Sequence, residues 1–351
     1  MRKHVNTVAT IVVGLTFFVC PIATPNSHEA SAADQDDMAT RAAASAAATR
    51  FLIVGKSKVA DPQEQQQRGI LAVRRVAEAA KAAQREAIVD ALTENVITIE
   101  QYRRGQTRET VTGKVFRERL RRLTEMAAPQ DTVVIYTHSH GRKNGFEDSQ
   151  PLGGIVMDLP VRQPEHGGAL LWDEYANLLL KIPAKNVVVL TMSCFSGGLV
   201  EYLNSPPVLD RWEDRRQKEG RNLIVLTSQN ERLTSGPIVK DKEVVNPFTY
   251  AVARALEGEA DGFALAAGKP VPGQRKDSRL SVGEVIDFIL YTTENTDSET
   301  TQRRNTARPQ LTGSFDRCDV LFAQIQGPGP DTRNNNTAQQ DAPADADKPR
   351  R

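Results

Sequence analysis

The stretch KNVVVLTMSCFSGG, residues Lys185 to Gly198, decides the fold of this chain. From Val187 it is a continuous run of mostly β-branched apolar residues, which is typical of a strand buried on both faces of a parallel sheet. Cys194 follows this run, and the small residues 196–198 then turn the chain. Open α/β sheets bind ligands at the carboxyl ends of their strands. The pattern therefore places Cys194 where a reactive group is expected.

A second stretch upstream has the same design. DTVVIYTHSHG, residues Asp131 to Gly141, is another apolar run, and it ends in His138, Ser139, His140 and Gly141. Two neighbouring parallel strands of this kind would bring an imidazole and a thiol together above one sheet edge. A thiol is a useful nucleophile only as the thiolate, which a nearby imidazole supplies or stabilises.

Together the two stretches resemble the caspase, metacaspase and legumain clan of cysteine peptidases. Members of this clan carry one hydrophobic strand that ends in His-Gly and another that ends in a small residue and Cys, often followed by x-Ser-Gly. SHG at 139–141 and SCFSGG at 193–198 both fit. Cys194 follows His140 by roughly 50 residues, which is also the spacing in caspases. The resemblance extends, in order, over about residues 51–316.

The resemblance implies a cysteine endopeptidase that acts on peptide or protein substrates and needs no cofactor. Cys194 would attack the peptide carbonyl and form a thioester acyl-enzyme, while His140 moves protons. The backbone N–H groups of Gly141 and Cys194 would hold the oxyanion. His138 is the weaker candidate base, because the family places glycine directly after the catalytic histidine.

The resemblance also implies substrate-binding residues. A strand at Leu223–Thr227 precedes a loop that forms part of the pocket in the family, and Ser228, Gln229 and Ser235 are the matching positions. Met192 stands two residues before the cysteine, where metacaspases and legumain-like enzymes carry an acidic residue and caspases carry glutamine. Because methionine offers no charge, the bond preference stays open. Nothing in the sequence places Glu231 or Asp158 in the pocket.

The expected elements predict the fold class. Strands at 51–55 and 96–99 alternate with helices that begin at Asp61-Pro62 and span 115–126, and helices follow at 170–182, 246–257 and 279–291. This order predicts an α/β protein, and the resemblance makes it a caspase-like three-layer sandwich with a mostly parallel sheet and helices on both faces. Residues 206–222 are polar and predict an exposed loop. By resemblance, Arg215-Arg216 and Lys218 in it are candidate autoprocessing sites.

The two ends of the chain predict processing and disorder. A basic start, an apolar core and an A-x-A pattern at Ala30–Ala33 predict a signal peptide at 1–32, which fits better than lipidation at Cys20. A linker at 33–50, a peptidase domain at 51–325 and a disordered tail at 326–351 follow. The mature protein is expected in the periplasm or secreted, without a stable membrane anchor. Its remaining cysteines, Cys194 and Cys318, could instead form a disulfide.

The composition narrows the possible partners. The 351-residue chain has a net charge of +1 and 5% aromatic residues, which argues for a soluble globular protein and against nucleic acid as a partner. The sequence shows no P-loop and no Cys/His metal cluster. Two other functions stay open: a caspase-like pseudoenzyme or binding module in which Cys194 is structural, and a transamidase that uses the same pair of residues.

Overall fold

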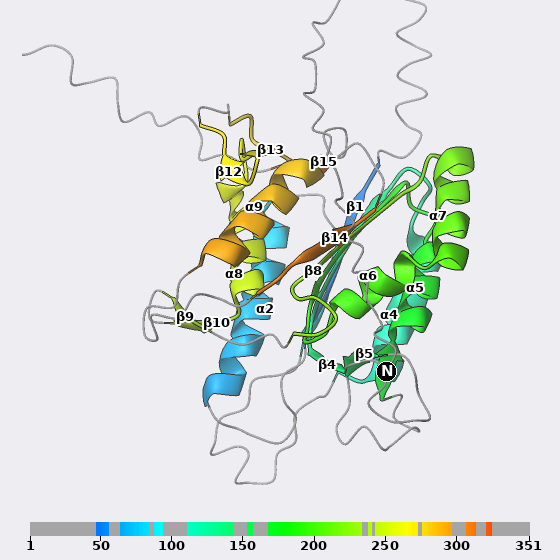
Figure 1. Ribbon diagram of the computed structural model, residues 1–351, viewed down its shortest axis with the longest axis horizontal. Helices are drawn as coiled ribbons and strands as arrows, with labels where there is room; N and C mark the ends of the chain where they lie inside the picture. Colours follow the sequence, from blue (N-terminus) through cyan, green and yellow to red (C-terminus); the bar gives the residue numbers. More distant parts are fainter. Residues whose placement is uncertain are drawn as a thin grey trace, which may run out of the picture. The chain divides into compact units, whose positions relative to one another are not determined.

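The structure, a computed structural model, describes eleven segments of the chain (Figure 1). They are residues 47–55, 64–83, 88–93, 111–142, 153–156, 168–233, 238–240, 243–272, 276–296, 307–313 and 321–324. The predicted signal peptide, most of the linker, the tail and the strand expected at 96–99 lie outside them. Those expectations therefore stay predictions.

A six-stranded sheet forms the centre of the described residues. Its strands are, in spatial order, β14 (Gln310–Thr312), β8 (Asn222–Thr227), β7 (Asn186–Met192), β3 (Thr132–His138), β1 (Thr49–Gly55) and β2 (Ile88–Thr93). Every neighbouring pair is parallel except β14 and β8, which are antiparallel. All seven residues of β7 are buried, as its uninterrupted apolar sequence predicts.

Helices cover both faces of this sheet (Figure 1). One face carries α2 (Glu64–Ala83), α8 (Pro247–Arg254), the π-helical turn η2 (Ala255–Glu259) and α9 (Val282–Asn295). The other face carries α4 (Gly113–Met126), α5 (Trp172–Lys181), α6 (Gly197–Leu203) and α7 (Pro206–Glu219). The predicted three-layer α/β class with a mostly parallel sheet is confirmed.

The two cores follow from the alternation of side chains along each strand. In β1, Phe51 and Ile53 pack in the core under α2, α8 and α9, while Leu52 and Val54 pack under α4 and α5. Successive strand residues point to opposite faces, so a strand that is apolar throughout supplies both cores at once.

Short strands form four smaller sheets. They are β4 (His140–Arg142) with β5 (Gly154–Val156) and β6 (Ala169–Leu171), β9 (Ile238–Lys240) with β10 (Glu243–Val245), β11 (Leu265–Ala266) with β12 (Lys269–Pro270), and β13 (Arg279–Ser281) with β15 (Leu321–Gln324). The first of these matters for function, because β4 begins at His140, two residues after β3 ends.

Two expectations about elements are wrong. Residues 206–219 form the helix α7, not an exposed loop, so Arg215, Arg216 and Lys218 lie within a regular helix. A peptidase cleaves an extended segment, and residues 206–219 are helical, so the three candidate autoprocessing residues are not in a suitable conformation. The second expectation, an α/β pattern without a strand between the first helix and residue 96, lacked β2, which pairs with β1 at the edge of the sheet.

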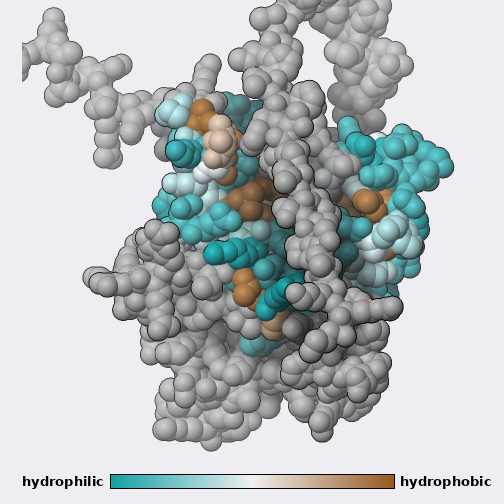
Figure 2. Space-filling model, viewed as in Figure 1, coloured by the Kyte–Doolittle hydropathy of each residue, from teal (hydrophilic) through white to brown (hydrophobic). Residues whose placement is uncertain are grey.

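The described surface is mostly hydrophilic on the face shown in Figure 2, with hydrophobic residues in small, separate patches. Large exposed hydrophobic side chains among the described residues are Met126 and Leu311. Among the described helices, none has the length and apolar character needed to cross a membrane.

Candidate active site at the ends of strands β3 and β7

The two predicted reactive residues come from neighbouring strands that end together. In the β3–β7 register, His138 lies opposite Met192, and Ser139 donates its backbone N–H to the carbonyl of Met192 over 3.1 Å. His140 follows Ser139 at the end of β3, and Ser193 and Cys194 follow Met192 at the end of β7. The carboxyl edge of the sheet therefore holds both residues, as the sequence predicts.

Gly141 brings the two segments into direct contact. A methyl group at this position would lie 2.6 Å from the carbonyl carbon of Cys194 and would overlap its oxygen. No side chain fits there, so the backbone after His140 can pass against the peptide group of Cys194 only because residue 141 is glycine. This close approach makes His140 and Cys194 near neighbours. Cys194 is partly exposed and forms no disulfide among the described residues, while Cys318 lies outside them.

His138 belongs to a separate hydrogen-bond network on the α8 side of the sheet. Its Nδ1 lies 2.9 Å from Thr249 Oγ1, and this hydroxyl lies 2.6 Å from the Tyr136 hydroxyl. Burial lowers the pKa of His138 to about 3, and the nearby charge of His140 acts in the same direction. Burial also raises the pKa of Tyr136 well above its usual value. His138 is therefore neutral near pH 7 and is held by internal partners.

The predicted pocket residues that the structure describes are largely buried. Met192 is 6% exposed and belongs to the core under α8, so little of its side chain can reach a substrate. Ser228 and Gln229 are 0% and 2% exposed. The Ser228 hydroxyl accepts the backbone N–H of Ser193, which precedes Cys194. Gln229 donates its backbone N–H to the hydroxyl of Ser196, which lies two residues after Cys194. Ser235 lies outside the described residues.

The segment that follows Gln229 runs beside the turn after Cys194. Phe195 donates its backbone N–H to the carbonyl of Leu233 over 2.9 Å, and a methyl group on Gly197 would lie 2.6 Å from the backbone nitrogen of Glu231. Glu231, which the sequence could not place, thus stands close to the Cys194 turn. Its carboxylate pairs with Arg232 over 3.0 Å.

Buried hydroxyls also gather beneath the site on the α5 side. Thr137 and Thr191 are register partners in β3 and β7, and Tyr175 of α5 faces both. All three are fully buried, yet none makes a hydrogen bond of good geometry. Burial raises the pKa of Tyr175, and the two threonine hydroxyls oppose that effect. The cluster is neutral and, being buried, is closed to a substrate.

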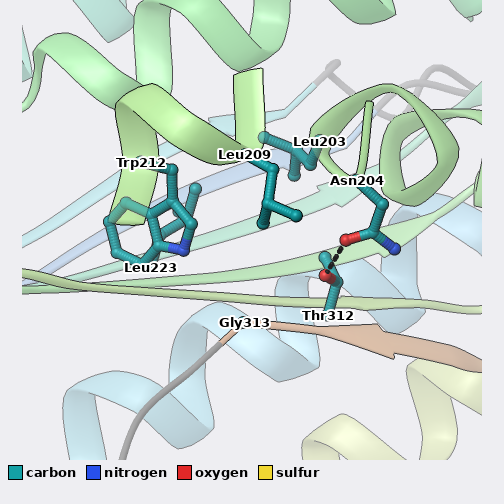
Figure 3. Close-up of a pocket in the computed structure, with 7 residues that line it drawn as sticks. All are labelled: Leu203, Asn204, Leu209, Trp212, Leu223, Thr312 and Gly313. Carbon is teal, nitrogen blue, oxygen red and sulfur yellow. Dashed lines mark hydrogen bonds between the residues drawn. The ribbon is translucent and has the colours of Figure 1, made fainter. Parts of the chain in front are cut away.

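A cavity of about 160 Å³ lies at the opposite end of α6 from Cys194 (Figure 3). Its wall is mostly apolar and includes Trp212 and Leu209, and Asn204 and Thr312 meet there in a 2.6 Å hydrogen bond. None of the residues that line this cavity belongs to the Cys194 site, so the two are separate. No group of three or more His, Cys, Asp or Glu side chains suited to a metal occurs in the described part of the chain.

Some residues near the site were not anticipated in these roles. Ser193 and Ser196 hold the turn around Cys194 through hydrogen bonds, and Thr249 holds His138 in its separate network. Their roles depend on segments far apart in sequence, so no local pattern could reveal them.

Comparisons with known proteins concern the fold. A structure of a protein from Geobacter sulfurreducens is 14% identical over 80% of this chain and all of its own, with a TM-score of 0.44. Caspase-1 from Spodoptera frugiperda is 10% identical over 80% of this chain and 91% of its own, with a TM-score of 0.43. No family model matches the sequence, and no curated protein matches it. The case for a function rests on the residues of the site.

Proposed function

We propose that this protein is a cysteine endopeptidase of the caspase-like type, with Cys194 as nucleophile and His140 as acid and base. The observation that supports this most directly is the contact of Gly141 with the peptide group of Cys194, because it sets an imidazole-bearing residue beside a partly exposed cysteine that forms no disulfide among the described residues. Both come from the strand ends at which α/β sheets bind ligands.

The reaction would proceed in two balanced steps. The Cys194 thiolate attacks the peptide carbonyl carbon, and the tetrahedral oxyanion accepts hydrogen bonds from the N–H groups of Gly141 and Cys194. The C–N bond then breaks, and the leaving amine takes a proton from His140. Water attacks the resulting thioester and gives one proton to His140, the C–S bond breaks, and the carboxylic acid product leaves while Cys194 is restored as the thiolate.

The first test measures the reactivity of the thiol. Purified mature protein is treated with iodoacetamide near neutral pH without reductant, and the labelled peptides are identified by mass spectrometry. We expect rapid labelling of Cys194, with Cys318 much slower. If Cys194 stays unlabelled until reductant is added, and a peptide linking Cys194 to Cys318 is found, the disulfide replaces this proposal.

The second test uses variants against a peptide library. We expect Cys194→Ala to abolish cleavage with the fold intact, and His140→Ala to slow cleavage by roughly 100-fold or more. His138→Gln serves as the matched control and should stay within a few-fold of the wild type, since His138 is held by internal partners. Full activity of Cys194→Ala would exclude the mechanism.

The same library separates the alternative functions. A labelled Cys194 without turnover of any peptide would favour a binding module. Products joined to an added amine in place of water would favour a transamidase. Because Glu231 stands close to the Cys194 turn, peptides with Lys or Arg before the scissile bond belong in the library, although Met192 supplies no charge.

We also propose that the protein acts in the periplasm or outside the cell, on the basis of its N-terminal sequence. Amino-terminal sequencing of the exported protein should begin at Ala33. A start at Met1 would contradict this.

A further inference from the structure

We infer that Ser196, Ser228 and Gln229 are positioning residues that hold the loop around Cys194 in its reactive geometry. This inference rests on the proposed function and assigns Ser228 and Gln229 a role different from the expected pocket wall. We call residues 193–196 the Cys194 loop and residues 227–229 the brace.

The Cys194 loop has a backbone that needs support. Phe195 has φ = 57°, in the left-handed region that residues with a Cβ adopt only at a cost. Its N–H is satisfied by Leu233, as described above. A conformation of this kind persists only where surrounding contacts hold it, and such residues cluster at functional sites.

The brace supplies these contacts on both sides of the cysteine. Ser193 donates its N–H to the Ser228 hydroxyl over 3.3 Å, and that hydroxyl can donate to the Ser193 carbonyl over the same distance. On the other side, Gln229 donates its N–H to the Ser196 hydroxyl over 3.2 Å, and this hydroxyl donates to the Gln229 carbonyl over 3.3 Å. The backbone is thus held both before and after Cys194, at Ser193 and at Ser196.

Burial separates this role from substrate binding. Ser193, Ser196, Ser228 and Gln229 are all at most 2% exposed, whereas Cys194 between the two serines is partly exposed. A substrate can therefore reach the thiol but not the hydroxyls that hold the loop. Losing one of these hydrogen bonds would leave a buried polar group unpaired, which costs more than the bond itself contributes.

The brace is itself anchored to the edge of the sheet. The Gln229 side-chain oxygen accepts the N–H of Arg308 over 3.1 Å, and the Thr227 hydroxyl lies within hydrogen-bond distance of the Gln310 carbonyl at 3.3 Å. Gln310 begins β14 and pairs with Thr227. The position of Cys194 therefore depends on a strand more than 100 residues further along the chain.

A positioning role predicts a specific kinetic change. Loss of a brace contact would shift the Cys194 thiol relative to His140, and a misplacement of about 1 Å can lower a catalytic rate by roughly 100-fold. Substrate contacts would be unchanged, so kcat should fall while KM stays the same. A substrate-binding role would raise KM instead.

The test compares Ser196→Ala with Ser205→Ala. Ser205 lies at the other end of α6, where its hydroxyl donates to the Tyr202 carbonyl over 2.6 Å, so the control also removes one serine hydrogen bond. We expect Ser196→Ala to lower kcat and the rate of Cys194 alkylation by roughly 10- to 100-fold, with an unchanged KM. Ser205→Ala should resemble the wild type in all three. Thermal unfolding checks that each variant is folded.

Ser228→Ala removes the hydrogen bonds on the other side of Cys194. It replaces Ser196→Ala in the same test if Ser196→Ala does not fold. The inference is overturned if the serine-to-alanine variants of the loop and brace behave like Ser205→Ala, or if they change KM alone. If Cys194 of the wild type is not labelled selectively, the proposed function fails. If the wild type is labelled but the loop and brace variants behave like Ser205→Ala, only the positioning role fails.

Discussion

At the scale of single residues, Gly141 is the position that most directly joins the two halves of the site. Its Cα lies where any side chain would collide with the Cys194 peptide group. The obstacle is backbone, which cannot rotate aside as a flexible side chain could. The Cys194 loop must therefore move if residue 141 gains a methyl group.

We predict that Gly141→Ala lowers both Cys194 alkylation and peptide cleavage by roughly 100-fold. Gly268→Ala is the matched control, because Gly268 has nothing within 4 Å of its missing side chain. Its φ of 74° predicts a small loss of stability but no change in the chemistry. Equal activity of the two variants would contradict the close approach at Gly141.

The sequence predicts the positions of His140 and Cys194 in the fold better than the contacts around them. His140 and Cys194 could be placed together because each follows a strand whose apolar run is unmistakable. Ser228 and Gln229 were identified by resemblance as substrate-binding residues, but they are buried, because burial at a loop depends on what packs over it. Here the cover comes from the Cys194 loop and from residues 307–310, which no local pattern connects.

At the scale of elements, α7 shows why a helix can be mistaken for a loop. Its deeply buried side chains are Val208 and Trp212, four residues apart, and the rest of its sequence is largely charged. This narrow apolar stripe is weaker than the stripe that normally marks a helix. The better signals were at its ends: Pro206 and Pro207 start the helix, and Gly220 ends it with φ = 64°.

We predict that Gly220→Ala lowers the free energy of unfolding by about 1 kcal/mol, because alanine adopts a positive φ poorly. The open space around Gly220 excludes a clash as the cause. Gly220→Asn should cost less, since asparagine tolerates this conformation. Urea unfolding of the three proteins measures the difference. An equal loss for both variants would mean that the C-cap conformation is not responsible.

At the scale of the whole molecule, Asp131 joins the turn before β3 to the start of β1 at the amino end of the sheet. Its carboxylate accepts the N–H groups of Ala48 and Ala128 and the Nε–H of Arg50, the last over 2.7 Å. Burial tends to raise the pKa of Asp131, but the hydrogen bonds from Arg50, Ala128 and Ala48 outweigh it, so the pKa is lowered. The ionised form therefore stabilises the fold.

We predict that Asp131→Asn costs about 2 to 4 kcal/mol of unfolding free energy near pH 7, since it removes a buried carboxylate and leaves the half-buried Arg50 without its ion pair. Because the folded pKa lies below the unfolded value, the contribution of Asp131 is present above about pH 4 and is lost as the pH falls through the folded pKa. Asp90→Asn is the control: Asp90 pairs with Arg119 in a partly exposed ion pair, and its loss should cost at most about 1 kcal/mol. Urea unfolding across pH checks both.

The layered architecture as a whole was predictable, and its edges were not. β3 and β7 are buried on both faces, so their sequences are apolar throughout and specify the middle of a parallel sheet. β2 and β14 lie at the edges, where residues meet only one neighbouring strand. Their sequences carry correspondingly fewer constraints, and they were missed.

The hydrogen bond between Gln229 and Arg308 also sets when the site is completed during synthesis. The two residues are 79 positions apart, so at ordinary translation rates Arg308 is made roughly 4 to 16 seconds after Gln229. Throughout that interval the growing chain already contains both reactive side chains but lacks the segment that anchors the loop between them. We therefore expect the nascent chain to carry an incompletely assembled site until its last strands have been translated.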